Sequence, residues 1–385
     1  MKTKAHEYAI CAAAASVFSV IIYFYSALSA VPQVMSVPAS AVSDVAVTDC
    51  PKTSAQAFAL ADVYSGEILH SLNGNSRLPM ASTTKIMTAL LIIENMDGEE
   101  QVKISREAVG VEGSSVYLAE GEVLTINELL YGLLLESGND AATALAIACA
   151  GDTASFADMM NARAKEMGLC NTHFDNPHGL SSQGHYTTAC ELAKITAVAM
   201  RNERFREIVS TQKYNIAERE NCRARYFSNH NRLLGNIISG DYMCNGVKTG
   251  YTEASGRCLV TSAGGECGRF VAVTLNDRND WKDHSALLSF AFDNYKSVKI
   301  AKSGELSYSF KTLGVPTYHA ELQNTEDIYI TLPKDYDGEI SVSAQMTRKS
   351  AENGATAGYM CVKAGDIERI FELNVTESRD VKVYE

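Results

Sequence analysis

The chain has 385 residues, of which 46% are apolar and 21% are charged, so it is long enough to bury large cores in two domains. Its formal net charge of −12 argues against a nucleic-acid partner, because no surplus of lysine and arginine can neutralise phosphates. The ten cysteines contain no C-x-x-C pair, so we assign no disulfide and expect neither a metal nor any other cofactor.

The N-terminal segment has the pattern of an export signal. Two lysines precede an uncharged, mostly apolar run over residues 9–30, and residues 38–41 (Pro-Ala-Ser-Ala) provide an A-x-A cleavage site. We expect residues 1–41 to direct the protein across the cytoplasmic membrane, with cleavage after Ala41 or nearer Ala30. The 22-residue run is also long enough to span a bilayer. An uncleaved N-terminal anchor, which would be the only membrane attachment, is therefore the alternative.

A first candidate catalytic motif, S-x-x-K, lies at the start of a predicted helix. Ser82 opens an apolar stretch over residues 83 to about 96, where free N–H groups and the helix dipole favour negative charge. Lys85 lies three positions later on the same helix face. A lysine with its ordinary pKa of about 10.4 is charged at pH 7, so Lys85 can act as a base only if burial and a second cation lower that pKa. Residues 210–213 fit the same pattern, so the motif alone does not identify the nucleophile.

A second motif lies between two predicted helices. Residues 125–128 (Thr-Ile-Asn-Glu) form a capping box that opens a helix over residues 126–136, and residues 141–150 continue as a second apolar helix. Ser137-Gly138-Asn139 occupies the corner, which can project its serine and asparagine sideways into a cleft. On its own, the motif also fits a C-cap glycine followed by a helix N-cap.

A third motif, Lys248-Thr249-Gly250, precedes two β-type runs over residues 257–262 and 269–275. We expect an edge strand followed by a hairpin. An edge strand presents unpaired backbone groups to which an extended peptide can bind as an added strand, and the glycine would let that peptide approach closely. The lysine of this motif is the candidate for the second cation beside Lys85.

The chain changes character after about Val298. Three segments that begin at residues 328, 340 and 371 alternate apolar with polar residues, and Asp337-Gly338 predicts a turn. We therefore expect a small antiparallel β domain over residues 299–385. It would follow a main domain over residues 55–298 and a flexible lead-in over residues 42–54.

The order of the three motifs and the residues that flank them resemble those of the low-molecular-mass penicillin-binding proteins, specifically the serine D-alanyl-D-alanine carboxypeptidases. The resemblance runs from about residue 55 to 296, and its blocks are residues 78–88, 137–142, 173–180 and 248–252. It implies an α/β fold, with a penicillin-binding/β-lactamase-like transpeptidase domain followed by a small all-β domain. In the first domain, helices would flank an antiparallel sheet, and an all-helical insertion over about residues 95–215 would carry Ser137.

The resemblance also implies which residues perform the chemistry. Ser82 would be the nucleophile that forms an acyl ester, Lys85 its base, and Ser137 the group that relays a proton to the leaving D-alanine. Asn139 would hold the substrate amide. The backbone N–H groups of Ser82 and Tyr251 would form the oxyanion hole.

A second set of residues would bind the end of the substrate. The resemblance implies that Lys248 and Thr249, next to Gly250, meet its terminal carboxylate. Arg278 lies where the family often has a basic residue beside that carboxylate, and we include it among the expected substrate-binding residues.

The expected function is that of a serine-type D-Ala-D-Ala carboxypeptidase acting on peptidoglycan stem peptides, with β-lactam antibiotics as covalent inhibitors. The alternatives are D,D-endopeptidase or transpeptidase action on the same substrate, a β-lactamase, and a non-catalytic penicillin-binding scaffold. Class A β-lactamases depend on a deacylation glutamate, and the corresponding loop, residues 171–184, contains none. A scaffold would have lost the serine or lysine pair, whereas Ser82, Lys85, Ser137 and Lys248 are all present.

Overall fold

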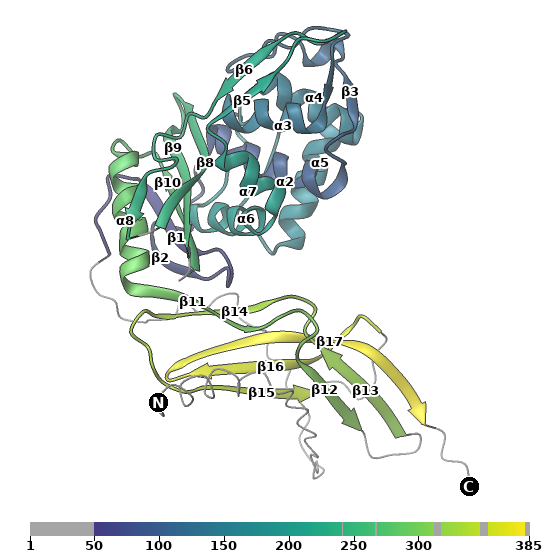
Figure 1. Ribbon diagram of the computed structural model, residues 1–385, viewed down its shortest axis with the longest axis vertical. Coiled ribbons are helices and arrows are strands. Elements are labelled where there is room, and N and C mark those ends of the chain that lie inside the picture. Colours follow the sequence, from purple (N-terminus) through teal and green to yellow (C-terminus); the bar gives the residue numbers. More distant parts are fainter. Residues whose placement is uncertain (1–49, 241, 266–267, 312–316, 347–352, 382–385) are drawn as a thin grey trace, which may run out of the picture. The chain divides into compact units, whose positions relative to one another are not determined.

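The computed structural model describes residues 50–240, 242–265, 268–311, 317–346 and 353–381 (Figure 1). The predicted export signal and most of the predicted lead-in, up to residue 49, lie outside the described residues. Within the described ranges, no helix is both long and apolar enough to cross a membrane. The described residues form two compact units: a larger one with residues 50–298 and 331–336, and a smaller one with the described residues of 299–330 and 337–381.

A six-stranded antiparallel sheet forms the centre of the larger unit, in the order β2-β1-β10-β9-β8-β7. Its strands are β1 (Ala57–Asp62), β2 (Ile68–Leu72), β7 (Ile237–Ser239), β8 (Tyr242–Thr252), β9 (Gly256–Gly265) and β10 (Gly268–Leu275). Every residue of β1 is buried, and alternate side chains enter two different cores. Ala59 packs in the core beneath α6, whereas Leu60 packs in the core beneath α8 (Asp280–Asn294). Helices therefore flank the sheet on both faces, which confirms the predicted α/β fold (Figure 1).

The remaining helices of the larger unit are α2 (Lys85–Asn95), α3 (Ile126–Leu135), α4 (Asn139–Ala150), α5 (Thr153–Glu166), α6 (Ala189–Arg201) and α7 (Glu203–Ser210). The predicted capping box is present, since Glu128 N–H donates to the Thr125 hydroxyl and Thr125 N–H donates to the Glu128 carboxylate. The second helix of the predicted corner begins two residues early, at Asn139.

The expectation of an all-helical insertion over residues 95–215 is wrong. A short strand pair, β3 (Gln101–Lys103) with β4 (Val123–Thr125), interrupts it, along with the short 3-10 turn η3 (Arg106–Ala108). At its end, β5 (Lys213–Ile216) pairs with β6 (Arg225–Ser228). The segment between α2 and α3 contains four glycines and few apolar residues at helical spacing, so it forms strands and loops instead.

Residues 331–336 belong to the larger unit although they follow part of the smaller one in sequence. The Thr331 hydroxyl donates to Asp62 Oδ2 at 2.9 Å, and Lys334 Nζ donates to Phe292 O at 2.7 Å. Asp62 is fully buried and also accepts a hydrogen bond from the Ser297 hydroxyl. Burial raises the pKa of Asp62, and the hydroxyl donors oppose this by stabilising the ionised form.

The described part of the smaller unit contains a five-stranded antiparallel sheet in the order β12-β13-β17-β16-β15. Its strands are β12 (Ser307–Lys311), β13 (Thr317–Gln323), β15 (Ile340–Met346), β16 (Thr356–Ala364) and β17 (Ile367–Val381). β11 (Tyr295–Ala301) and β14 (Ile328–Pro333) form a separate two-stranded sheet. In β16, Met360, Val362 and Ala364 are buried and alternate with more exposed residues, as expected of a sheet with one covered face. The predicted β-rich region is thus present.

Candidate active site

Ser82 lies in a short 3-10 turn, η2 (Ala81–Thr84), that runs directly into α2. Within this turn the Thr84 hydroxyl donates to Ala81 O at 2.7 Å, which helps to fix its shape. Ser82 is therefore at a helix N-terminus, and the 3-10 turn begins at Ala81, whose φ of +47° is left-handed, rather than at residue 83 as expected. Free N–H groups at this position favour the negative charge that develops when a serine attacks a carbonyl.

Two glycines let neighbouring segments pack directly against the Ser82 turn. A Cβ at Gly179, whose φ is +95°, would lie 2.1 Å from Ala81 O. A Cβ at Gly250 would lie 3.1 Å from Ser82 N. Gly250 therefore lets the nucleophile turn pack closely, and since it also lines the cavity in front of Ser82, its role in letting a substrate approach stays a prediction.

Lys85 is completely buried and touches three oxygen atoms. Its Nζ lies 2.9 Å from Ser82 Oγ, 2.7 Å from Asn139 Oδ1 and 2.6 Å from His178 O. Burial lowers the pKa of Lys85 well below its ordinary value, and the nearby Lys248 lowers it further, while Asp140 acts in the opposite direction. A lysine in this environment loses its proton at a much lower pH than a free lysine.

The geometry around a neutral Lys85 directs its lone pair toward the nucleophile. A neutral amine has two N–H donors and one lone pair. Asn139 Oδ1 and His178 O can only accept hydrogen bonds, so they take the two N–H groups. The remaining partner is the Ser82 hydroxyl, which can donate its proton to the lone pair. The three contacts therefore suit Lys85 to the role of a general base.

Asn139 is buried and both ends of its amide are engaged within the protein. Its Oδ1 accepts from Lys85, and its Nδ2 donates to Glu112 O at 2.6 Å. The resemblance implied a contact with the substrate amide, but this conformation uses the side chain to orient Lys85. The second motif thus contributes a positioning residue as well as the serine at its start.

A cavity of about 530 Å³ lies in front of the nucleophile. It is lined by Ser82, Ser114, Ser137, His230, Thr249, Gly250, Tyr251, Arg257, Cys258, Asp280 and Trp281. Ser82 and Ser137 therefore face one cavity although they are 55 positions apart in the sequence. Ser137 is mostly buried and has φ +64°, an uncommon conformation for a residue other than glycine that often marks a functional position.

The third motif lies in β8, and the part that carries it has one free edge. Residues 247–252 pair with β9, whereas β7 pairs only with residues 242 and 243. The sequence predicted an edge strand, but β7 lies beyond β8 in the sheet. The segment of β8 that carries the motif still has one unpaired edge. Lys248 is buried, and burial lowers its pKa to about 7, opposed by the negative charge of Glu136.

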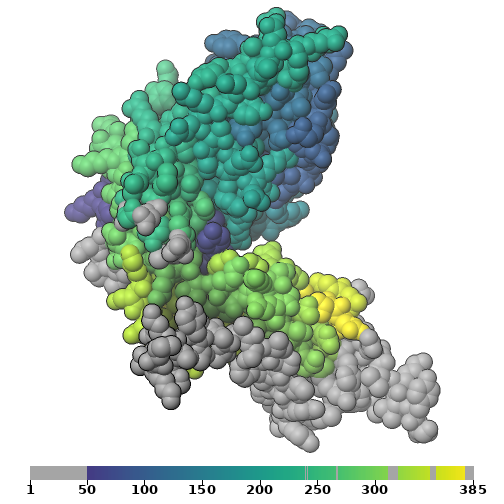
Figure 2. All heavy atoms as spheres, in the orientation of Figure 1, coloured from purple at the N-terminus to yellow at the C-terminus, as the bar shows by residue number. Residues whose placement is uncertain are grey.

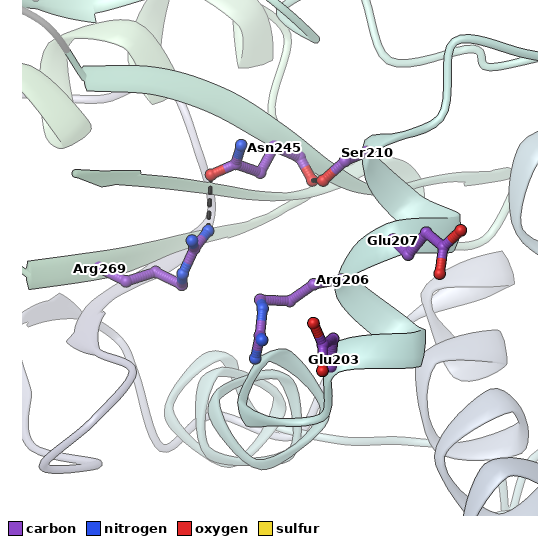
Figure 3. Close-up of a pocket in the computed structure, with 6 residues that line it drawn as sticks. All are labelled: Glu203, Arg206, Glu207, Ser210, Asn245 and Arg269. Atoms are coloured by element: carbon purple, nitrogen blue, oxygen red, sulfur yellow. Dashed lines mark hydrogen bonds between the residues drawn. The ribbon is translucent and has the colours of Figure 1, made fainter.

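The second S-x-x-K sequence does not form a comparable pair. Ser210 lines a separate open hollow with Glu203, Arg206, Glu207, Asn245 and Arg269 (Figure 3). Its hydroxyl donates to Asn245 O at 3.4 Å, and Lys213 is exposed with Nζ 6.0 Å from the centre of the Tyr226 ring. Ser82, and not Ser210, has a buried lysine at hydrogen-bonding distance.

The comparisons with known proteins agree with this geometry. A model of the D-alanyl-D-alanine carboxypeptidase family, peptidase family S11, matches residues 44–279. The chain is 33% identical over 333 residues to the D-alanyl-D-alanine carboxypeptidase DacF of Bacillus subtilis, an alignment that covers 83% of each protein. The chain belongs to the D-alanyl-D-alanine carboxypeptidase family. It is a serine-type hydrolase with the activity that gives the family its name, as the motifs predicted.

Solved structures of the carboxypeptidase family have the same fold. Penicillin-binding protein 5 from Haemophilus influenzae matches with a TM-score of 0.69 and 26% identity, covering 86% of this chain and 99% of that one. A mutant of the Streptomyces K15 DD-transpeptidase matches with a TM-score of 0.58 and 30% identity, covering 63% of this chain and 99% of that one. The predicted penicillin-binding-protein fold is thereby confirmed.

The arginine in the cavity of this carboxypeptidase is not the one that the sequence suggested. Arg278 is exposed and is not among the residues that line the cavity, whereas Arg257 is. Arg257 Nε and Nη2 donate to the Asp280 carboxylate at 2.8–3.0 Å. The Arg257 side chain is 44% exposed, and within the described residues its Nη1 has no hydrogen-bond partner.

Sequence reasoning also missed five other lining residues, Ser114, His230, Cys258, Asp280 and Trp281. Trp281 is the only tryptophan of the chain, which was a usable signal, but nothing local relates it to the motifs. The residue before it, Asp280, also lines the cavity and accepts a hydrogen bond from Arg257. His230 lies 3.2 Å from the Glu136 carboxylate, next to Ser137.

A buried histidine, His185, and a half-buried one, His178, brace the loop that supports Lys85. His185 Nε2 lies 2.7 Å from Thr84 Oγ1, and its Nδ1 accepts from Asp175 N–H. His178 provides the carbonyl that binds Lys85. Burial lowers the pKa of both imidazoles to about 4, so they are neutral at pH 7 and add no charge beside Lys85.

Proposed function

We propose that this carboxypeptidase removes the terminal D-alanine of peptidoglycan stem peptides outside the cytoplasmic membrane, through an acyl-enzyme on Ser82. The observation that carries the proposal is the environment of Lys85. This lysine is buried, is flanked by two groups that can only accept hydrogen bonds, and lies 2.9 Å from Ser82 Oγ. The family membership supplies the substrate class, and the predicted export signal supplies the location.

In the proposed acylation step, neutral Lys85 takes the hydroxyl proton of Ser82 while Oγ attacks the carbonyl carbon between the two D-alanines. The oxyanion that forms accepts hydrogen bonds from the N–H groups of Ser82 and Tyr251. Ser137, on the same cavity, gives its hydroxyl proton to the leaving nitrogen as the C–N bond breaks and takes in return the proton held by Lys85, so Lys85 is neutral again and free D-alanine departs. Water then attacks the ester carbonyl while Lys85 takes its proton, and that proton passes to Ser82 Oγ as the ester C–O bond breaks, which regenerates Ser82.

The proposed binding site for the terminal carboxylate combines Thr249 with Arg257, assisted by Lys248. Thr249 and Arg257 both line the cavity that contains Ser82. Asp280 holds the guanidinium through Nε and Nη2, so Nη1 is free to donate to a substrate carboxylate. Lys248 is buried beneath this region and adds positive charge when protonated. We therefore replace the expected Arg278 with Arg257 in this role.

The rest of the stem peptide is proposed to bind along β8. Residues 247–252 have one free edge, where an extended peptide can pair as an additional antiparallel strand. β-Lactams would occupy the same cavity and acylate the same serine. Because residues 171–184 contain no glutamate to activate water, we expect the penicilloyl ester to outlive the peptidyl ester.

The test compares two serines that both fit S-x-x-K. Ser82→Ala should abolish D-alanine release from a peptide ending in D-Ala-D-Ala and also abolish covalent labelling by fluorescent penicillin. Ser210→Ala is the matched control and should retain both activities. Labelling that persists in Ser82→Ala and disappears in Ser210→Ala would show that the nucleophile had been misassigned.

Transpeptidation is the second candidate activity. The likeness to the Streptomyces K15 DD-transpeptidase, at 30% identity and with nearly all of that chain covered, favours it. An acyl-enzyme open to solvent can be attacked by an amine as well as by water. Adding a D-amino acid to the peptide assay and measuring exchanged peptide against released D-alanine would distinguish the two activities.

A further inference from the structure

Tyr117 is the most exposed large hydrophobic residue among the described part of the chain, with 82% of its surface accessible. Its backbone has φ +59°, a conformation that costs free energy for a bulky residue. The two neighbours, Val116 and Leu118, are both buried. The loop therefore turns a single aromatic ring outward between two side chains that anchor it.

A buried carboxylate holds this loop in place from one side. Asp140 accepts hydrogen bonds from the Ser115 hydroxyl at 2.6 Å, from Val116 N–H at 3.0 Å and from Leu118 N–H at 3.1 Å. Asp140 is in the first turn of α4, directly after the Ser137 motif. The loop is thus fixed to the same helix start that carries the catalytic corner.

An arginine holds the loop from the other side. Arg225 Nε donates to Val116 O at 2.9 Å, and its Nη2 donates to Tyr117 O at 3.0 Å. The guanidinium is itself paired with Glu122 at 2.5 Å, and both of these side chains are only 7% exposed. In the space-filling view, blue atoms from about residues 80–150 lie next to teal atoms from about residues 180–250, in agreement with the hydrogen bond from Val123 N–H to Asn221 O (Figure 2).

The loop leads directly from the active-site cavity. Ser114 lines the cavity, and its carbonyl accepts from Asn139 N–H at 2.7 Å. Tyr117 is three residues farther along, so its Cα lies within about 10 Å of that wall. A stem peptide has three residues between D-Ala-D-Ala and the sugar that carries it, and these also span about 10 Å when extended.

We propose that Tyr117 forms a subsite for the sugar ring that carries the stem peptide, so that the enzyme recognises glycan-linked peptide better than free peptide. The proposal rests on the proposed function. A rigid, exposed tyrosine offers an apolar face for the C–H groups of a sugar and a hydroxyl for its polar groups, at little cost in side-chain entropy. The backbone of Tyr117 is held in a strained conformation, and such residues cluster at binding and catalytic sites.

The test uses two substrates that differ only by the sugar: a pentapeptide ending in D-Ala-D-Ala, and the same peptide on a disaccharide of N-acetylated amino sugars. Tyr117→Gly removes the ring and also the backbone strain. We expect it to lower kcat/KM for the glycopeptide about five- to tenfold, mainly through KM, and to leave the free peptide within twofold. Its Tm should equal or exceed that of the wild type. Tyr117→Phe should restore most of the glycopeptide preference.

Binding measured by calorimetry on Ser82→Ala protein makes the test independent of turnover. In that background, Tyr117→Gly should weaken the glycopeptide about five- to tenfold and leave the free peptide unchanged. Asn73→Gly, which relieves a φ of +49° at another exposed position, is the matched control and should change neither affinity. Equal affinities for the two ligands in the wild type, or equal losses for both in Tyr117→Gly, would overturn the subsite. Absence of D-alanine release from either substrate would instead overturn the proposed function.

Discussion

Replacing Gly179 by alanine should inactivate the enzyme by moving the nucleophile, without removing any catalytic group. The new Cβ would lie 2.1 Å from Ala81 O and 2.9 Å from Ser82 N. An ordinary contact at this position needs more than 3 Å, so the loop and the Ser82 turn must separate by about 1 Å. The same loop provides His178 O to Lys85, so the base would shift with it.

The cost can be divided into two parts. The φ of +95° at Gly179 disfavours any residue with a Cβ by about 1–2 kcal/mol, and the steric overlap adds about 1–3 kcal/mol to the loss of stability. A displacement of about 1 Å in a reacting group costs about a hundredfold in rate, which corresponds to about 2.7 kcal/mol of transition-state stabilisation. We therefore expect penicillin acylation to slow about a hundredfold in protein that still folds.

Gly168→Ala provides the matched control for this experiment. Gly168 has φ +71°, but a Cβ there would meet nothing within 4 Å. It should lose about 1–2 kcal/mol of stability in denaturant unfolding and keep the wild-type rate of labelling by fluorescent penicillin. If Gly179→Ala is acylated as fast as Gly168→Ala, the packing of the loop does not position Ser82, and our reasoning is wrong.

Three further predictions concern the charged groups. The acylation rate should rise with pH as Lys85 loses its proton, with an apparent pKa far below that of free lysine, and a flat profile from pH 6 to 10 with chemistry rate-limiting would contradict a lysine base. Lys248 has a pKa of about 7, so its charge is present below pH 7 and lost above it, and KM for substrates with a free carboxylate should increase as the pH rises through 7. Amidating the terminal carboxylate should lower kcat/KM about ten- to a hundredfold, and Arg257→Ala should cause a similar loss that Arg278→Ala does not. Equal losses in both arginine variants, or cleavage of amidated peptide at the normal rate, would refute the carboxylate site.

The features that the sequence predicted well depend on neighbours within one turn or one strand. Ser82 and Lys85 are three residues apart on a helix, and the capping box from Thr125 to Glu128 is equally local. Alternation from residue 328 in β14 and from residue 371 in β17 marks the covered side chains in the same way, since Ile328, Ile330 and Leu332 are buried in β14, and Leu373 and Val375 in β17. In each case the spacing alone determines which side chains share a face.

The features that the sequence missed depend on contacts between distant segments. Asn139 reaches Lys85 across 54 positions, and Gly179 packs on Ala81 from 98 positions away. Arg257 enters the cavity because Asp280, at the start of α8, holds its guanidinium. No periodicity encodes such pairs, since they arise only when helices and sheet pack together. The choice between Arg257 and Arg278 could therefore not be made from spacing.

The return of residues 331–336 to the larger unit has a consequence for dissecting the enzyme. A fragment that ends at residue 298 would contain the three motifs, yet it would lack Thr331 and Lys334. Asp62 would then keep its place at the end of β1 with one hydroxyl donor fewer, and a buried carboxylate without its donors favours the protonated or unfolded state. The compact unit that contains the three motifs is thus discontinuous in the sequence. Deleting the β-rich region while keeping this unit whole would require a linker from residue 298 to residue 331, so that residues 331–336 stay with the enzyme.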